Sequence, residues 1–140
     1  MIGKYLKISA FVCISLVYIL SLTRDIYGGD VGDLVTAAVL GGVAHPPGYP
    51  LFTFIGFIFS HIPFVPLPPV TKVSLISAVS AIGFLIVFYR TAKLFSKNDE
   101  ISLLSVLIIA FGYHFWLFAV IPEVFMLHAL LVALVFYSGC

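Results

Sequence analysis

The chain has 140 residues, of which 62% are hydrophobic and only 9% are charged, whereas about a quarter of the residues in an ordinary soluble domain carry a charge. This composition, together with a mean hydropathy of +1.21 and recurring apolar runs of about 15 to 20 residues, excludes a water-soluble globule and predicts an all-α, polytopic membrane protein. Seven basic and six acidic residues give a formal net charge of +1, so nucleic-acid binding, which needs a strongly basic surface, is not expected.

Four apolar runs are predicted to cross the membrane, because each approaches the roughly 20 residues that a helix needs to span the hydrocarbon. The first, residues 5–22, begins next to Lys4 and Lys7, and no small-residue cleavage site follows it. We therefore interpret it as an uncleaved helix with a cytoplasmic N-terminus. The other three predicted spans are residues 70–89, 101–120 and 124–140.

A fifth apolar run, LFTFIGFIFSHI at residues 51–62, is bounded by Pro50 and Pro63 and is too short to span. Orientation follows the Lys and Arg residues of short loops. If this run does not cross, five of the seven basic residues are cytoplasmic and only Arg24 and Lys72 are outside. We therefore expect a helix along the outer surface with its aromatic side chains in the interface. These side chains are Phe52, Phe54, Phe57 and Phe59.

The resulting layout has both chain ends inside and makes residues 23–69 one long outer segment with membrane-surface helices. A cytoplasmic loop follows at residues 90–100, where Asp99 is expected near Lys97, and a tight outer turn lies at residues 122–123. We expect residues 1–140 to form a single membrane domain. Its location would be the plasma membrane of a bacterium or archaeon, or the endoplasmic reticulum.

Two aspartates lie at the start of the first predicted surface helix. Asp30 and Asp33 lie in the string GGDVGDL, and the apolar stretch VTAAVLGGVA follows it directly. One interpretation is structural, with Asp30 capping a short helix and Asp33 at its third position as in a capping box. The other is catalytic, because three-residue spacing puts both carboxylates on one helix face. Desolvation and repulsion near a membrane would raise the pKa of at least one of them, which favours a general base.

The string HPPGYP at residues 45–50 contains three prolines and a glycine, which fix a stiff turn. A rigid backbone around His45 and Tyr49 suits a binding site. The string equally fits a plain connector between two surface helices, with His45 as a polar surface residue. Both interpretations stay open on spacing alone.

Two further polar residues have both a structural and a functional interpretation. Glu123 follows Pro122 at the start of an apolar span, where a proline and an acid are expected for structural reasons. It would alternatively be an acidic ligand facing the same outer cavity as the two aspartates. Lys72 either extends its ammonium group to the surface or pairs with a phosphate.

Three strings together carry a family resemblance: GGDVGDL, AHPPGYPLF and WLFAVIPEVF at residues 116–125. They resemble the N-terminal part of the membrane glycosyltransferases grouped as domain of unknown function 2723, whose eukaryotic members include an endoplasmic-reticulum protein O-mannosyltransferase. The family pattern at the acidic motif usually reads Asp-Ser-Gly-Glu-Leu. This chain has Val31 in place of the serine and Asp33 in place of the glutamate, which leaves the acidic spacing intact.

The resemblance implies a GT-C fold and transfer of a sugar, such as mannose, from a polyprenyl phosphate to a hydroxyl of a protein or glycan acceptor at the outer face. The donor is a substrate that arrives from the membrane lipid, no bound cofactor is implied, and no residue is assigned to a metal. Asp30 is implied as the general base and Asp33 as its orienting partner. The residues implied to shape the donor site, close the cavity or stabilise the phosphate charge are His45, Tyr49, Glu123, Lys72 and Arg24.

Complete members of that family have many more spans, so we expect this chain to be an N-terminal fragment with the active-site loop and without a whole catalytic cavity. The alternative is a non-catalytic small membrane subunit or a lipid-binding scaffold, which the short length favours. A transporter is disfavoured because the acidic residues cluster at one face rather than along a midplane path.

Overall fold

The computed structural model describes residues 2–26 and 28–140, and within these ranges the chain forms seven helices and no strand. The prediction of an all-α protein is therefore confirmed. In chain order the helices are α1 (Ile2–Leu20), α2 (Val31–Leu40), α3 (Pro50–Ser60), α4 (Pro69–Ser96), α5 (Asp99–Ala110), α6 (Tyr113–Val120) and α7 (Phe125–Ser138).

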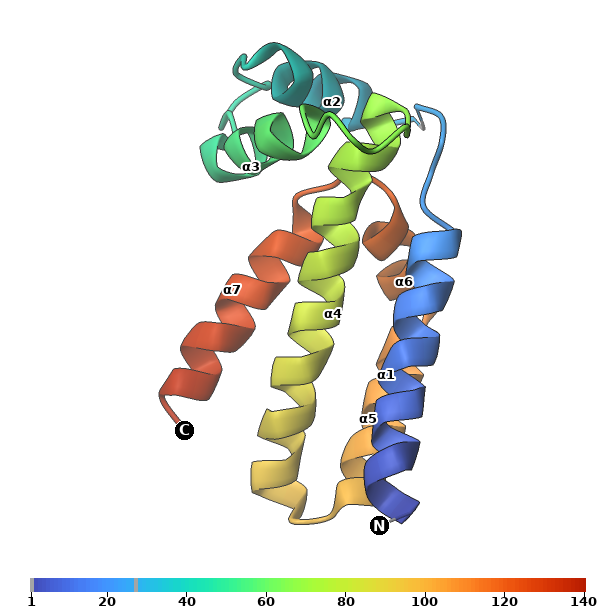
Figure 1. The fold of residues 1–140 in the computed structure, drawn as a ribbon. Coiled ribbons are helices and arrows are strands. Elements are labelled where there is room, and N and C mark those ends of the chain that lie inside the picture. The colour runs from blue at the N-terminus through green and yellow to red at the C-terminus, as the bar shows by residue number, and fades with distance from the viewer. Residues whose placement is uncertain (1, 27) are drawn as a thin grey trace.

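Helix α4 is the centre of the molecule and contacts each of the other helices. Figure 1 shows α1, α5 and α6 on one side of α4 and α7 on the other, with α2 and α3 lying across one end of this bundle. The N-terminus and the α4–α5 connection lie at the opposite end. The segments predicted to be outer and cytoplasmic therefore lie at opposite ends of the bundle, and the side of the membrane on which each lies stays a prediction.

Only α4, among the described residues, is by itself long and apolar enough to cross a membrane. It was predicted to end at residue 89 but continues to Ser96, so part of the expected loop is helical. Helices α5 and α6 together also have the required length and composition, although they are bent by 67°. The remaining apolar helices are shorter, and the four-span layout stays a prediction.

The predicted span at residues 101–120 consists of two helices rather than one, because the helix breaks between Ala110 and Tyr113. Gly112 is in an extended conformation at the break. Such a break leaves backbone groups without helical partners, and in an apolar environment these must bond elsewhere. The buried Tyr18 of α1 donates its hydroxyl hydrogen to the Ala110 carbonyl at 2.8 Å, so α1 supplies a partner that the broken helix lacks.

The packing divides into two apolar clusters, one inside the bundle and one beneath the cap that α2 and α3 form against α4. Phe52 of α3 is only 2% exposed in the cap cluster, so its predicted place in the membrane interface is wrong. Phe54 and Phe57 are exposed, as expected for a surface helix.

Helices α2 and α3 approach closely where Gly56 faces Ala38. A Cβ atom added to Gly56 would lie only 2.7 Å from that of Ala38.

A charged cluster closes the end of the bundle away from the cap. The Asp99 carboxylate pairs with Lys7 of α1 at 2.6 Å and with Lys93 of α4 at 2.8 Å, and it accepts a hydrogen bond from the Tyr89 hydroxyl. These partners, and Lys7 first, hold the pKa of the Asp99 carboxyl well below its usual range. Asp99, which the sequence places near Lys97, thus forms its ion pairs with Lys7 and Lys93.

Candidate functional site

Helix α2 begins where the sequence predicts, directly after Asp30, and ends at Gly41, whose φ of 66° gives the left-handed cap that glycine favours. Asp30 has the helical φ and ψ of −82° and −3°, and its side chain makes no capping hydrogen bond. A capping carboxylate would accept a hydrogen bond from one of the next backbone N–H groups. Capping therefore does not explain Asp30, although the residue stands at the capping position.

Asp33 binds His45 across the loop between α2 and α3. Its Oδ2 atom accepts a hydrogen bond from the His45 backbone N–H at 2.8 Å and lies 2.7 Å from the Nδ1 atom of the His45 ring. One carboxylate oxygen thus holds both the backbone and the imidazole of the same residue. The expected capping box at Asp33 is replaced by this longer-range contact.

His45 also faces Asp30, because its Nε2 atom lies 3.5 Å from the Asp30 Oδ2 atom. The histidine side chain is 36% exposed, whereas the Asp30 and Asp33 side chains are 60% and 48% exposed. The imidazole therefore bridges the two carboxylates, and each carboxylate keeps a surface open to an incoming molecule.

The proline-rich turn sets the direction of the His45 ring. The Gly48 N–H donates to the His45 carbonyl at 2.8 Å, and the Pro46–Pro47 bond is cis. Gly48 has a φ of 89°, a region that glycine enters without steric cost. Tyr49 follows with a φ of 44°, and its ring packs edge-on against His45 at a centroid distance of 5.4 Å. The turn is therefore part of the His45 environment, which favours the site interpretation over the plain connector.

Glu123 reaches the same region from the turn between α6 and α7. It is 8% exposed, and the hydroxyl of the fully buried Ser77 fixes its backbone, donating to the Glu123 carbonyl at 3.1 Å and accepting from its N–H at 3.2 Å. Burial, followed by repulsion from Asp30, raises the pKa of the Glu123 carboxyl, and the nearby His45 acts in the opposite direction. Glu123 directly precedes Val124, the N-cap of α7, and a hydrogen bond from the Val124 backbone lowers the pKa of its carboxyl, so the structural interpretation at a helix start stays open beside the functional one.

Asp33 and His45 change each other's pKa in opposite directions. The hydrogen bonds from His45, first from its backbone and then from its ring, lower the pKa of the Asp33 carboxyl. The bond to Asp33 in turn raises the pKa of the His45 imidazole, with Asp30 acting in the same direction. Asp33 is therefore not an aspartate whose pKa crowding raises. Within the described ranges, no group of acidic, histidine and cysteine side chains is arranged to hold a metal ion.

The two basic residues of the outer segment differ in their contacts. Lys72 donates from its ammonium group to the Ser60 and Ile62 carbonyls, at 3.3 and 2.9 Å. It thereby supplies hydrogen bonds to carbonyls at and just beyond the C-terminal end of α3, where a positive charge also interacts favourably with the helix dipole. Arg24 is exposed on the segment that follows α1. A phosphate-binding role for either residue stays a prediction.

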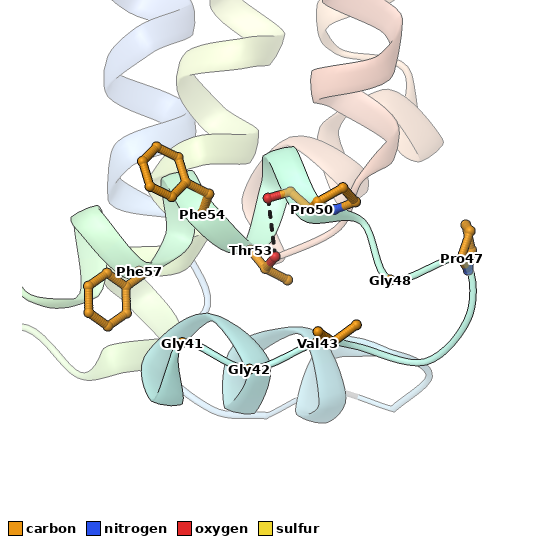
Figure 2. Close-up of a pocket in the computed structure, with 9 residues that line it drawn as sticks. All are labelled: Gly41, Gly42, Val43, Pro47, Gly48, Pro50, Thr53, Phe54 and Phe57. Atoms are coloured by element: carbon orange, nitrogen blue, oxygen red, sulfur yellow. Dashed lines mark hydrogen bonds between the residues drawn. The ribbon is translucent and has the colours of Figure 1, made fainter.

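An apolar pocket of about 640 Å³ lies between α2 and α3. Figure 2 shows the Thr53 side chain on the side of α3 that faces residues 41–43, with the Pro47–Gly48 stretch at one end of the pocket. This stretch directly follows His45 and Pro46 in the chain. The pocket therefore shares a loop with the acidic cluster, by which we mean Asp30, Asp33, His45 and Glu123. The sequence gives no direct signal for the pocket beyond the glycines at 41, 42 and 48.

Ser77 was not predicted as part of the site. It is one of several serines on the buried face of α4, and its bonds to the Glu123 backbone join α4 to the α6–α7 turn. A serine inside an apolar helix is the signal in the sequence, because a buried hydroxyl needs a partner. The identity of that partner, far away in the chain, depends on the fold.

Comparisons with known proteins place this chain in a family. The family described as Protein O-mannosyl-transferase TMEM260 N-terminal domain matches residues 30–140. The Dictyostelium discoideum protein O-mannosyl-transferase tmem260 is 39% identical over 145 residues, which cover 97% of this chain and 18% of that protein. The Mus musculus protein O-mannosyl-transferase TMEM260 is 35% identical over 129 residues, which cover 91% and 18%.

No solved structure matches the chain. The chain spans less than a fifth of the length of these curated relatives. The matched segment begins at Asp30 and includes Asp33, His45 and Glu123, so all four members of the acidic cluster lie within it. The chain belongs to the family of the protein O-mannosyl-transferase TMEM260 N-terminal domain.

Proposed function

We propose that this chain forms the acceptor-activating part of a GT-C-type glycosyltransferase, the fold of the wider group called domain of unknown function 2723. The reaction would move a sugar, mannose according to the names of the relatives, from a polyprenyl phosphate to an acceptor hydroxyl at the outer face. The observation that carries the proposal is the pairing of Asp33 with His45, which leaves the Asp30 carboxylate beside them uncapped and 60% exposed.

In this proposal Asp30 is the general base. The acceptor oxygen attacks the anomeric carbon while the bond from that carbon to the phosphate oxygen breaks, and the lipid phosphate leaves with the bonding electrons. Asp30 takes the hydroxyl proton during the attack, which is the role of a positioned carboxylate in acid–base catalysis. Attack opposite the leaving group inverts the configuration at the anomeric carbon.

The remaining residues would handle the donor. His45 and Tyr49, whose rings pack edge-on, are proposed to shape the donor site, and the buried Glu123 would close it from the α6–α7 turn. Lys72 and Arg24 are proposed to stabilise the phosphate charge as it develops, because fixed positive groups near a leaving anion lower the barrier. The donor would arrive from the surrounding lipid.

A chimera tests the proposal, with these 140 residues replacing the matching segment of the mouse relative in cells that lack their own copy. We expect the chimera to restore protein O-mannosylation and Asp30→Asn to reduce the transfer rate by about 100-fold or more. Asp25→Asn is the matched control, because Asp25 is an exposed aspartate of the same outer segment. Full activity of Asp30→Asn at normal protein levels would refute Asp30 as the base.

A lipid-binding scaffold without catalysis is the second candidate, and the apolar pocket between α2 and α3 favours it. The test is binding of a radiolabelled polyprenyl-phosphate mannose to the 140-residue chain in lipid nanodiscs. A scaffold predicts binding that Asp30→Asn leaves unchanged, together with a chimera that inserts normally but transfers no sugar.

A further inference from the structure

The Asp33–His45 contact fixes which ring nitrogen of His45 carries a proton. A carboxylate oxygen accepts hydrogen bonds and donates none, and Oδ2 of Asp33 lies 2.7 Å from Nδ1. Nδ1 therefore carries hydrogen in both the neutral and the charged imidazole. The backbone N–H of the same residue donates to the same oxygen at 2.8 Å, so this second bond holds the Asp33 carboxylate beside the ring.

Protonation of the ring then changes only at Nε2, and this atom faces Asp30. The distance from Nε2 to the Asp30 Oδ2 atom is 3.5 Å, which is just beyond hydrogen-bond length and closes with a small side-chain movement. The other neighbours are the edge-on ring of Tyr49 and the charge of Glu123 from the α6–α7 turn. Asp30, Asp33 and Glu123 all favour a positive imidazole over a neutral one.

We propose that His45 is a relay residue that removes the proton from Asp30 after each transfer, a role that rests on the proposed function. The acceptor O–H bond breaks as an O–H bond forms on Asp30. That second bond then breaks as an N–H bond forms at Nε2, so the Asp30 carboxylate is regenerated and the imidazole becomes positive. The 36% exposed ring passes the proton to water.

The raised pKa of the imidazole supports this direction of transfer, because a more basic ring holds the proton longer than a free histidine would. Asp33 is then a positioning residue, since it orients the ring and stabilises the imidazolium without touching the substrate. An aspartate that orients a histidine in this way has the same logic as the third member of a hydrolase triad.

The first test is independent of activity. Nuclear magnetic resonance of the 140-residue chain, labelled with nitrogen-15 at histidine and placed in lipid nanodiscs, reports the tautomer and pKa of His45, with His45→Asn used to assign its signals. We expect the neutral ring to carry hydrogen on Nδ1 and its pKa to lie above the ordinary 6.5. Asp33→Asn should lower that pKa. A neutral ring with hydrogen on Nε2, or a titration that Asp33→Asn leaves unchanged, would overturn the proposal.

The second test measures transfer by the chimera as a function of pH. A relay accepts a proton only while Nε2 is unprotonated, so we expect the rate to fall with decreasing pH through a pKa above 6.5. The side-chain amide of His45→Asn can still donate toward Asp33 but has no counterpart of Nε2. We expect this variant to lose the acid limb near neutral pH and to be at least about tenfold slower in kcat, with KM little changed.

Two controls separate a relay from a merely structural role. His61→Asn alters an exposed histidine at the end of α3 and should leave the pH profile unchanged. Added imidazole should restore part of the rate of His45→Ala and none of the rate of Asp30→Asn. An inactive Asp30→Asn combined with an unchanged profile for His45→Asn would overturn the relay alone, whereas a fully active Asp30→Asn would overturn the proposed function and the relay together.

Discussion

The Asp33 carboxylate ties the start of α2 to the proline-rich turn, and the strength of this tie depends on two protonation states. A lowered carboxyl pKa stabilises the fold above the ordinary value of 3.8, and this contribution is lost as the pH falls through the lowered value. A raised imidazole pKa stabilises the fold below 6.5, and this contribution is lost as the pH rises through the raised value. The Asp33–His45 pair therefore stabilises the fold most between about pH 3.8 and pH 6.5.

Asp33→Asn should remove this pH dependence. We expect the apparent melting temperature of the wild-type chain in detergent to decline on both sides of the window, and the decline toward neutral and basic pH to flatten in the variant. The difference in melting temperature between the wild type and Asp33→Asn should shrink at high salt, because the Asp33 and His45 side chains are partly exposed and their charges are screened. Equal pH profiles for the variant and the wild type, with Asp25→Asn as the control, would contradict a stabilising Asp33–His45 pair.

Local rules account for part of the site and long-range packing for the rest. Two glycines before Asp30 and two after Leu40 are enough to place α2 and to put the two aspartates at its start. The contact between Asp33 and His45 joins residues that are 12 positions apart, and its direction depends on how the proline-rich turn is built. The approach of Glu123 depends on Ser77 of α4, which no pattern near Glu123 reveals.

Among the elements, the α2–α3 pair holds the site over the bundle through one very close approach. Gly56→Ala would bring a new methyl group to 2.7 Å from the Ala38 Cβ atom, which has no rotamer by which to move away. We expect this variant to be destabilised by about 1–3 kcal/mol, the usual cost of overpacking. The measurement is thermal unfolding in detergent, together with limited proteolysis of the α2–α3 loop.

A second substitution tests whether the clash with Ala38 is what destabilises Gly56→Ala. Ala38→Gly removes the opposing methyl group, so the double variant Ala38→Gly, Gly56→Ala should recover part of the lost stability, less the roughly 1 kcal/mol that glycine costs inside a helix. Gly28→Ala is a control outside the contact, because nothing lies within 4 Å of a Cβ atom there. If the double variant were less stable than the additive sum of the single variants, the close approach would not be the cause.

Apolar runs in the sequence predict most of the helices, and prolines mark the starts of α3 and α4. The break between α5 and α6 was missed because both halves are equally apolar, and a single glycine at 112 is tolerated in many helices. The compensating bond comes from Tyr18, which is 92 positions away from Ala110. A pattern read along one segment therefore cannot reveal this break.

At the scale of the whole molecule, the polar clusters lie at opposite ends of the bundle. Asp30, Asp33, His45 and Glu123 belong to the cap end, and Asp99 with Lys7 and Lys93 belongs to the other. The distribution of Lys and Arg predicts that the cap lies on the non-cytosolic side. The proposed chemistry requires that side, because the acceptor is expected there.

Cysteine labelling checks this orientation. In a chain with Cys13 and Cys140 replaced by serine, Asp25→Cys should react with a membrane-impermeant maleimide added to intact cells, whereas Lys97→Cys should react only after permeabilisation. Both positions are exposed in the structure, so access depends on the side of the membrane. The reverse pattern would place the acidic cluster in the cytosol and exclude an outer-face transferase.

Helix α4 contacts every other helix, yet about half of the chain precedes its first residue, Pro69. During synthesis, α2 and α3 leave the ribosome before the helix that buries their apolar faces exists. The newly made α2 and α3 must therefore stay unassembled until residues 69–96 have followed them. This interval is when aggregation or proteolytic attack has most opportunity, and substitutions that weaken α4 should appear first as lower yield rather than as slower chemistry.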